Sequence, residues 1–518
     1  MIEDVVHYEN LISGKKYRIE GTLIDKSTGE PLRDAEGNEI RAEKEFTAKD
    51  AEGDETVVFE FDGSILAGKV TVAFEELFTE KKSIAVHADI EDMPQTVKFP
   101  RIQTQAVDKE TGTNMAMASE EAVIVDTVSY WNLIPKHQYH LEGTLMDLET
   151  KETAVDADGN ELHADMAFVP EKEDGEVELT FRFSGKGLEG HTFVVFEELS
   201  MEKSWFQEET VAVHKDLEDE AQTVHIPKVW TTALDDETLT HQAQADGEVG
   251  VTDMVFYSNV LAGNEYTVKG VLMDHETGEQ LKDDQGETVT AETTFVAEET
   301  EGEVPVEFSL SGSSLKGKTA VIYETLEYEG TPVANHEDLE ETKQSIYFPA
   351  IKTSAKDQAD DDKELIIKDV VTIRDRVEYQ NLIPDTEYRI EGTVMDKKTG
   401  EALVVDGAPV RAERIFKPEK PSGKVDVDFT FQSKGLEEKE LVVFEKLYMA
   451  ENETEVAVHE DLEDQDQTVR LVREPSPPRR VKTGDGYGGK VYLYLTLALV
   501  SCGGMALSNR KKNFFNWK

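Results

Sequence analysis

The sequence has one cysteine in 518 residues and few basic side chains for its length. The single cysteine, Cys502, cannot form a disulfide within the chain or build a metal site from several thiolates. Lys and Arg number 54 against 109 Asp and Glu, which gives a formal net charge of −55. Such an acidic surface repels phosphate backbones and anionic headgroups, so the composition argues against nucleic acid as a partner and against a basic membrane patch.

Secretory and helical signals are also scarce. The first residues, Met1-Ile2-Glu3-Asp4, lack the basic and apolar stretches of a signal peptide, so we expect none in the sequence as given. Outside residues 491–507 no long stretch repeats its apolar residues with the period of a helix. Short runs of alternating β-branched and aromatic residues, separated by Gly, Asp and Asn, predict strands instead. Hydrophobic residues make up 38% of the chain, which is enough for packed cores in several domains.

The C-terminal residues 473–518 differ from the rest of the chain. A Pro-rich stretch, 474–480, predicts an extended spacer. Residues 491–507 are uncharged and mostly apolar, and the basic residues 510–512 follow them. A helix of this length nearly crosses a bilayer core, and the basic end is typical of the cytoplasmic side. We therefore predict a membrane-spanning segment; a buried core helix is the alternative.

A Thr-Gly pair lies between the spacer and the apolar run. Thr483-Gly484, followed by an apolar span and a basic tail, resembles the sorting signal of Gram-positive surface proteins. In that family a sortase cuts between Thr and Gly and joins the Thr to the cell wall. Here Arg480 and Val481 stand where the usual pattern has Leu and Pro. The resemblance implies sortase and cell-wall peptidoglycan as partners, with a membrane contact through the apolar run before sorting.

An internal repeat is the strongest signal in the chain. An Asp-x-Val-x-Tyr-x-Asn segment occurs four times, with its Asp residues 122, 127 and 122 positions apart. Many short strands in units of this size predict an all-β fold of tandem immunoglobulin-like β-sandwich domains, followed by the C-terminal sorting and transmembrane segment. The predicted units 1 to 4 are residues 1–100, 101–227, 228–349 and 350–472.

Polar residues interrupt the apolar faces of the predicted strands at the same places in every unit. Residues two apart on a strand share a face, so Asp126 points the same way as Val128, and Glu197 the same way as Leu199. The equivalent polar residues are Asp4, Asp253 and Asp375; Glu75, Glu324 and Glu445; His87, His214, His336 and His459; Gln95, Gln222, Gln344 and Gln467; and Thr104, Thr231 and Thr353.

The spacing of these residues is constant. Thr precedes Asp by 22 residues in three units, His precedes Gln by 8 in all four, and Gln precedes the next Thr by 9. Buried polar groups are costly unless they meet one another, so we predict that the five converge between the first and last strands. Thr offers a nucleophilic hydroxyl, His a base, and the buried acids a proton that polarises the amide oxygen of Gln. Attack on the Gln Cδ atom then expels ammonia and leaves an ester, once per unit.

This pattern resembles the VaFE-repeat surface proteins of Gram-positive bacteria, whose modules are similar to Thr–Gln ester-bond domains. In that family a Thr on the first strand is joined to a Gln on the last, and nearby Asp, Glu and His assist. The resemblance covers residues 1–472 and implies no cofactor. It assigns the cross-linked pairs Thr104–Gln222, Thr231–Gln344 and Thr353–Gln467, with the assisting residues Asp126, Glu197, His214, Asp253, Glu324, His336, Asp375, Glu445 and His459.

The first unit departs from this pattern. It keeps Asp4, Glu75, His87 and Gln95 but has no Thr strand, because the sequence as given has no residue 22 positions before Asp4. We therefore expect unit 1 to be N-terminally truncated, to lack its ester and to expose a sheet edge. The sequence is then expected to be a fragment, with a signal peptide and further domains upstream.

Three other readings stay open. A metal site could use the His, Asp and Glu residues, but it leaves the Thr and Gln unexplained. A Lys–Asn isopeptide needs a Lys in register beside the Thr strand, and none recurs there. The run Asp156-Ala-Asp158-Gly-Asn160 is similar to part of a calcium loop, but its counterparts vary, which favours a hairpin turn. We predict no metal.

The sequence thus predicts a structural stalk of a cell-surface adhesin, extracellular and anchored at its C-terminus to the cell wall or membrane. Self-formed esters would stabilise it without cysteine. The alternative is a ligand-binding adhesin in which one unit itself contacts host matrix or glycan; a host ligand could also bind an upstream tip. An enzyme with turnover, such as a Thr–His hydrolase, is the less favoured reading, because four similar sites lie inside predicted sandwiches.

Overall fold

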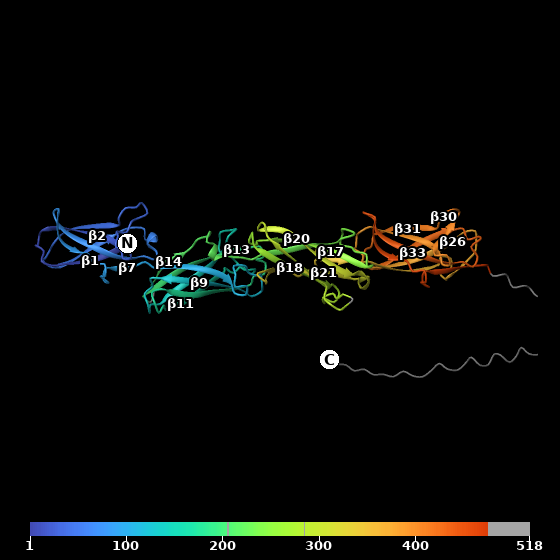
Figure 1. Ribbon diagram of the computed structural model, residues 1–518, viewed down its shortest axis with the longest axis horizontal. Helices are drawn as coiled ribbons and strands as arrows, with labels where there is room; N and C mark the ends of the chain where they lie inside the picture. Colours follow the sequence, from blue (N-terminus) through green and yellow to red (C-terminus); the bar gives the residue numbers. More distant parts are fainter. Residues whose placement is uncertain (205–206, 284, 475–518) are drawn as a thin grey trace, which may run out of the picture.

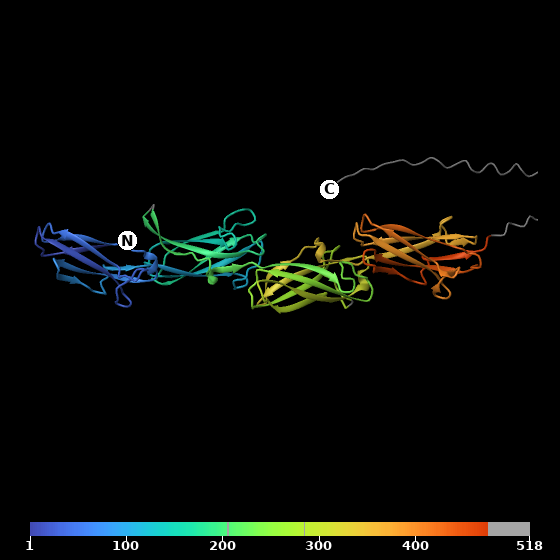
Figure 2. The same ribbon diagram turned by 90° about the horizontal axis from the view of Figure 1, so that it is seen from above.

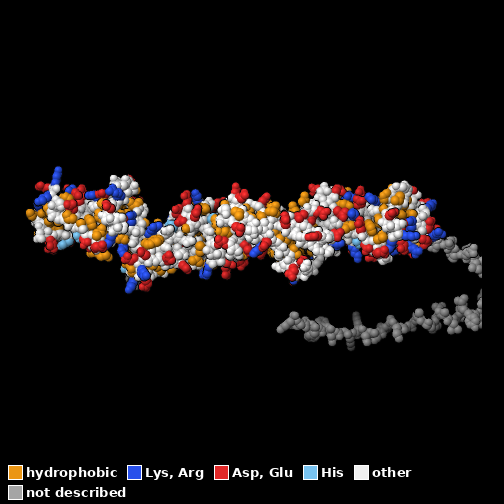
Figure 3. Space-filling view, in the orientation of Figure 1, with side chains coloured by type: hydrophobic (Ala, Val, Ile, Leu, Met, Phe, Trp, Pro, Cys, Tyr) orange, Lys and Arg blue, Asp and Glu red, His pale blue; other side chains and the backbone are white. Residues whose placement is uncertain are grey.

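Four β-sandwich units lie end to end in the computed structural model (Figures 1 and 2). The structure describes residues 1–204, 207–283 and 285–474. In these described ranges all regular structure is strand apart from four short 3-10 helices, so the expected all-β class is confirmed. Asp and Glu side chains are spread over the visible face of every unit (Figure 3), as the net charge predicts.

Each unit pairs a small sheet with a larger one. In unit 1 the small sheet is β1 (Ile2–Tyr8) and β4 (Gly53–Phe59). The larger sheet runs β3 (Arg41–Thr47), β2 (Lys16–Asp25), β5 (Val70–Thr79) and β6 (Lys82–His87), with β7 (Thr96–Lys98) beside β5; helix η1 is Gly63–Leu66.

Units 2 and 3 add a third strand to the small sheet. The small sheet of unit 2 consists of β8 (Arg101–Asp108), β9 (Ala122–Trp131) and β12 (Gly175–Phe183). The small sheet of unit 3 consists of β16 (Lys228–Asp235), β17 (Glu248–Ser258) and β20 (Glu301–Ser311). The larger sheet of unit 2 consists of β11 (His163–Phe168), β10 (Tyr139–Asp147), β13 (Thr192–Ser204), β14 (Gln207–His214) and β15 (Thr223–His225). The larger sheet of unit 3 consists of β19 (Thr290–Val296), β18 (Glu265–Asp274), β21 (Thr319–Tyr328), β22 (Thr331–His336) and β23 (Ser345–Tyr347). The 3-10 helices are η2 (Glu220–Gln222), η3 (Gly312–Leu315) and η4 (Thr342–Gln344).

Unit 4 follows the same plan. Its small sheet is β24 (Ala350–Asp357), β26 (Val371–Gln380) and β32 (Gly423–Phe431). Its larger sheet holds β25 (Glu364–Ile366), β35 (Thr468–Val472), β33 (Glu440–Met449), β27 (Tyr388–Asp396), β28 (Glu401–Ala402), β31 (Arg411–Phe416) and β34 (Thr454–His459), and β29 (Val404–Val405) pairs with β30 (Ala408–Pro409).

Each unit has its own hydrophobic core, formed where the inward residues of its two sheets meet. Burial alternates along the strands, as in β9, where every second side chain is buried. One glycine per unit, such as Gly143 on β10, lies under a Phe ring of the facing sheet. A Cβ atom there would collide with Phe181, which explains the recurring Gly after the Tyr of this strand.

The edge of the small sheet distinguishes unit 1. Among the described residues, β1 pairs with β4 alone, whereas β9, β17 and β26 each have a strand on both sides. The expected open sheet edge is therefore present in the described chain.

The predicted C-terminal features lie outside the described residues. These are Thr483, Gly484 and the apolar run 491–507. In the part of the chain that the structure does describe, no helix is long and apolar enough to span a membrane.

Candidate functional site

The recurrent polar residues meet between the two sheets of each sandwich. In unit 2, Thr104 lies on β8 and Asp126 on β9, and the residue opposite Asp126 on β8 is Ala106, two positions after Thr104. Glu197 on β13 and His214 on β14 are direct cross-strand partners in the facing sheet. The same register places Glu75 opposite His87, Glu324 opposite His336, and Glu445 opposite His459.

The Gln of unit 2 is placed by a turn immediately before the last strand. Gln222 ends helix η2, in which the side chain of Asp219 caps the backbone N–H of Ala221. Its side chain is fully buried, and its Nε2 atom donates to Thr104 Oγ1 at 2.8 Å and to Glu197 Oε2 at 2.7 Å. The Thr104 hydroxyl is also 3.5 Å from His214 Nδ1. All five predicted residues of this unit therefore lie in one cluster, in which four side chains are buried and His214 is partly exposed.

Unit 4 repeats this arrangement. Gln467 Nε2 donates to Thr353 Oγ1 at 2.8 Å and to Glu445 Oε2 at 2.9 Å. The Thr353 hydroxyl donates to Glu445 Oε2 at 3.1 Å and lies 3.3 Å from His459 Nδ1. Thr, Gln, Glu and the paired Asp375 are all buried.

Unit 3 assembles the site less completely. Gln344 Nε2 donates to Glu324 Oε2 at 2.9 Å and to the carbonyl oxygen of His336 at 3.2 Å. Thr231 is buried, but among the described residues neither its hydroxyl nor His336 Nδ1 has a hydrogen-bond partner. The five residue types are present, and the reactive contact between Thr231 and Gln344 is not formed in this structure.

Unit 1 has the site without the Thr. Gln95 Nε2 donates to Glu75 Oε2, and Asp4 and His87 lie beside the same carboxyl group. The His87 side chain is 54% exposed, against 20% for His214 and 21% for His459. The difference fits the open edge of β1, because in the other units the Thr strand covers this side of the site.

Each site contains a buried pair of carboxyl groups. In unit 2 both oxygens of Asp126 and Glu197 Oε1 lack any hydrogen-bond donor among the described residues. Burial and the neighbouring Asp126 carboxyl raise the pKa of Glu197 far above its usual range. A proton shared between the two acids would give two of these three oxygens a partner. Burial likewise raises the pKa of Glu324 and Glu445 well above normal, and that of Glu75 to about 8.

The orientation of the Gln amide differs from the sequence-based expectation. The sequence predicts an acid that polarises the amide oxygen. In the structure the amide nitrogen of Gln222 faces Glu197, and its oxygen is buried without a donor. The carboxyl pair is therefore next to the nitrogen that must leave.

A second acid contacts the His, and sequence reasoning missed it. Asp219 Oδ2 lies 3.2 Å from His214 Nε2, and the same contact is 3.3 Å between Asp464 and His459. In unit 1, Asp92 contacts His87 at 3.0 Å, and Glu341 holds this position in unit 3. An acceptor at Nε2 holds the proton there and leaves Nδ1 free to take the Thr proton. The signal was available, because an acid follows each His by five residues.

Unit 4 has an additional cation at its site. The Lys363 ammonium group donates to the carbonyl oxygens of Ala355, at 2.7 Å, and Asp466. Ala355 is the cross-strand partner of Asp375, and Asp466 precedes Gln467. Lys363 therefore ties the Thr strand to the Gln turn in this unit, and burial lowers the pKa of its ammonium group.

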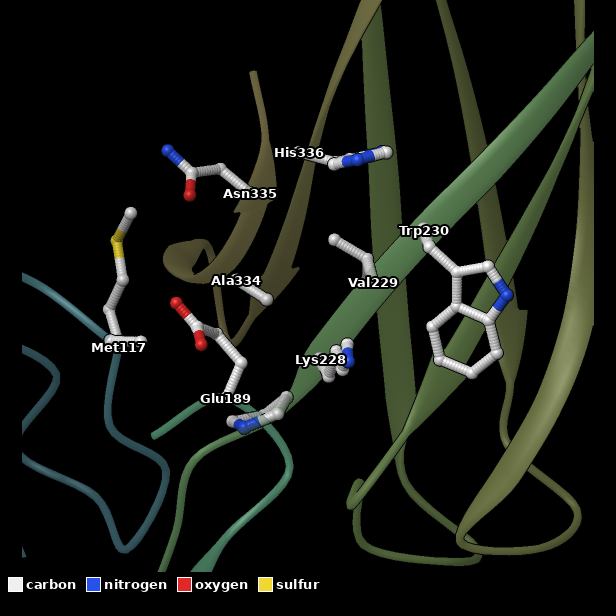
Figure 4. A pocket seen from close by; sticks show the side chains of 10 residues that line it. Met117, Glu189, Lys228, Val229, Trp230, Ala334, Asn335 and His336 are labelled. Atoms are coloured by element: carbon white, nitrogen blue, oxygen red, sulfur yellow. The ribbon is translucent and has the colours of Figure 1, made fainter. Parts of the chain in front are cut away.

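Two sites open toward junctions between units. His336 lines a cavity of about 190 Å³ that is also bounded by Met117 and Glu189 of unit 2 (Figure 4). His459 lines an equivalent cavity of about 230 Å³ between units 3 and 4. These cavities connect the proton-accepting histidine of each site, His336 or His459, with solvent.

The structure bears on the metal and calcium readings. Among the described residues, the one group of three or more His and acidic side chains close enough to hold an ion together is His7, Glu9 and Glu52, which are exposed and lie outside the predicted sites. Asp156 caps its own turn, because its Oδ1 atom accepts the backbone N–H groups of Asp158 and Asn160. This is the geometry of a hairpin turn.

The pH dependence of any reaction at the unit 4 site follows from these groups. His459 must be neutral to accept a proton, and burial lowers its pKa below 6.5, so the base stays available in mild acid. Burial and the neighbouring Asp375 carboxyl raise the pKa of Glu445 well above its usual range, so the carboxyl pair keeps its proton to higher pH than exposed carboxyl groups do. When the chain is refolded from a denatured, unreacted precursor, we expect ammonia release from unit 4 to be fast across neutral pH and to fall on both sides. The variant Glu460→Gln, on the exposed neighbour of His459, should leave the profile unchanged; a rate that rises steadily to high pH would contradict the need for a protonated acid.

Comparisons with known proteins agree with the repeat. The model of one family, described as T-Q ester bond containing domain, matches residues 1–99, 100–226, 227–348 and 349–471. A search of curated proteins found no match.

Similar solved structures include an adhesin from Mobiluncus mulieris, described as containing intramolecular disulfide, isopeptide and ester bond cross-links. It is 16% identical over 50% of this chain and 88% of its own, with a TM-score of 0.23. The C-terminal domain of the AgI/II polypeptide BspA from Streptococcus agalactiae is 9% identical over 47% of this chain and 100% of its own, with a TM-score of 0.25. A tetra-tandem repeat from the extending region of a large adhesion protein is 12% identical over 89% and 93%, with a TM-score of 0.19.

These TM-scores are too low to support any conclusion about this chain. The family match covers nearly all of the described residues and confirms the resemblance to Thr–Gln ester-bond domains. The chain therefore belongs to the family of T-Q ester bond containing domains and carries four of them in succession.

Proposed function

We propose that units 2, 3 and 4 each form one intramolecular ester between Thr and Gln. The Thr hydroxyl passes its proton to His Nδ1 and attacks the Gln Cδ atom. The C–N bond breaks, the proton reaches the departing nitrogen from the His or the carboxyl pair, and ammonia leaves. Each unit reacts once, so the chain is a single-turnover catalyst of its own cross-linking and not an enzyme.

One observation supports this proposal above the others. In units 2 and 4 the Thr hydroxyl accepts from the side-chain amide of Gln at 2.8 Å, His Nδ1 lies within 3.5 Å of that hydroxyl, and a buried Glu accepts from the amide. Groups held in this way react with the advantage of high effective molarity. For unit 3 the proposal further requires a small movement of the Thr231 hydroxyl toward Gln344.

Intact mass tests the cross-links directly. We expect residues 1–472, produced in a cytoplasmic host, to weigh about 51 Da less than the sequence predicts, because each ester releases one ammonia of about 17 Da. Thr104→Ala, Thr231→Ala and Thr353→Ala should each reduce the deficit by one step, and mild base should cleave the esters. A folded protein with the plain sequence mass would contradict the proposal and leave a hydrogen-bonded network in its place.

The biological role we propose is that of a stalk at the cell surface. Each ester ties the first strand of a unit to its last turn, so tension along the chain passes through covalent bonds. Four units in a row suit the task of holding a binding tip away from the cell. The alternative, binding of host matrix or glycan by one unit, predicts saturable binding by residues 1–472 alone; a stalk predicts none.

We also propose that the chain is extracellular and attached to the wall through Thr483. A sortase would cut between Thr483 and Gly484 and transfer the chain to peptidoglycan, after residues 491–507 had held it in the membrane. Incubation of the full chain with sortase and a peptidoglycan amine, followed by mass analysis, tests this step, and Thr483→Ala provides the control. An uncut wild-type chain would leave membrane retention as the means of anchoring.

A further inference from the structure

Consecutive units are joined by very short linkers. Only two residues separate the last strand of one unit from the first strand of the next, and the second of them is Pro: Phe99-Pro100, Ile226-Pro227 and Phe348-Pro349. A short link containing Pro limits the backbone, but it does not by itself fix the rotation between two domains. Side-chain contacts across the junction decide whether the units are hinged or fixed.

The first such contact is an Asn of the following unit, which we call the clamp. Asn259 has φ 60°, a conformation that Asn tolerates better than most residues. Its Nδ2 atom donates to the carbonyl oxygens of His191, at 2.6 Å, and Ile226, at 3.0 Å, both in unit 2. These carbonyls also accept the backbone N–H groups of Ile226 and Gly190, so the clamp fills their remaining acceptor sites.

The clamp occurs at all three junctions, with different numbers of bonds. The hydroxyl of Thr192 donates to Asn259 Oδ1 at 2.7 Å, and that of Thr319 to Asn381 Oδ1 at 2.9 Å. Val70 holds the corresponding place at the first junction and has no hydroxyl. The remaining clamp bonds run from Asn132 to the carbonyls of Lys69 (3.4 Å) and Phe99 (3.1 Å), and from Asn381 to those of Lys318 and Phe348 (3.5 Å).

The second contact runs in the opposite direction, and we call it the plug. Met115 of unit 2 lies beside the last strand of its own unit, is 0% exposed, and belongs to the hydrophobic core of unit 3. Gln242 holds the same position in unit 3, and its buried Oε1 atom accepts from the Tyr388 hydroxyl of unit 4 at 2.9 Å. In unit 4 this position is Glu364, which is exposed.

We propose that the clamp and the plug together lock units 2, 3 and 4 into one stiff rod with a fixed rotation at the two junctions between them. The clamp reaches back into the preceding unit and the plug reaches forward into the following one. Neither unit can turn without breaking the hydrogen bonds of the clamp or exposing the plug residue to water. The partner that fits this surface is the end of another unit of the same kind. The inference is independent of the ester, which lies inside each unit.

A distance distribution between neighbouring units tests the lock. The full chain with Cys502→Ser has no other cysteine, so Glu178→Cys in unit 2 and Glu303→Cys in unit 3, both exposed, accept a fluorophore pair. We expect a narrow single-molecule distribution. Asn259→Gly keeps the positive φ without strain and removes only the amide, so the distribution should broaden about twofold, toward that of a flexibly linked pair.

Two further variants complete the test. Asn10→Gly is the matched control, because Asn10 has φ 60° in the same turn and no described unit precedes it. Met115→Glu introduces at the plug the residue found in unit 4, and it should broaden the distribution as Asn259→Gly does. Circular dichroism confirms that the units stay folded, whether or not esters form. A broad wild-type distribution, or an Asn259→Gly distribution equal to the wild type, would overturn the proposal.

Discussion

Thr353→Ala is expected to let unit 4 extend under force, whereas unit 4 of the wild type does not. Thr353 and Gln467 are 114 residues apart, and an ester between them takes the intervening chain out of the path of the load. Without the ester, single-molecule pulling should show a new step of about 400 Å, the extended length of those residues. Loss of a closed loop of this size should also reduce the free energy of unfolding of unit 4 by about 4–5 kcal/mol in the chain-entropy model.

The neighbouring residue on the same strand gives the control for this experiment. Ser354 lies beside Thr353 on β24 but on the opposite face, so Ser354→Ala should keep the wild-type force trace. A wild-type chain that already extends by the full length of unit 4 would show that its ester is absent or does not bear load. The force experiment thus tests the stalk role, which the mass experiment alone does not.

Glu197→Gln is expected to slow ester formation in unit 2 by about 10²–10⁴-fold, the usual contribution of a positioned acid. The substitution keeps the shape of the side chain and removes the proton that the buried carboxyl pair shares. The measurement is the time course of the 17 Da loss from unit 2 after refolding of a denatured precursor, followed by peptide mass.

Glu198→Gln is the matched control for this variant. Glu198 is the next residue on β13 and contacts Thr210 and Lys215 outside the site. Its substitution should leave the rate unchanged. Wild-type kinetics for Glu197→Gln would instead mean that Thr104, His214 and Asp219 suffice without the carboxyl pair.

The features that could be predicted from the sequence are those that follow from a regular period, such as the two-residue alternation of side chains along a strand. Side chains alternate across a strand, so an Asp or Glu in register with Val and Leu had to point inward, and the structure buries Asp126, Glu197 and their equivalents in units 3 and 4 completely. The repeat of about 122 residues likewise predicted the units, because each repeat contains the strands needed for one sandwich core.

Other features of the site depend on distances between side-chain atoms, which the spacing of residues along the sequence does not determine. Units 2, 3 and 4 have the same five residue types, but only in units 2 and 4 is the Thr hydroxyl hydrogen-bonded to the Gln amide. The side of the amide that faces Glu197 depends on a side-chain torsion. Asp219 was overlooked because it lies in a turn, where alternation gives no orientation.

The sequence by itself thus determined the all-β class, the four units, and the five residue types that meet between the sheets, since local periodicity and spacing control which face each side chain takes. Only the tertiary structure decided which atoms of these residues are in contact, which second acid orients the His, and how neighbouring units contact each other through Asn259 and Met115. These contacts join residues that are distant along the chain, and their geometry is set by how sheets and units pack.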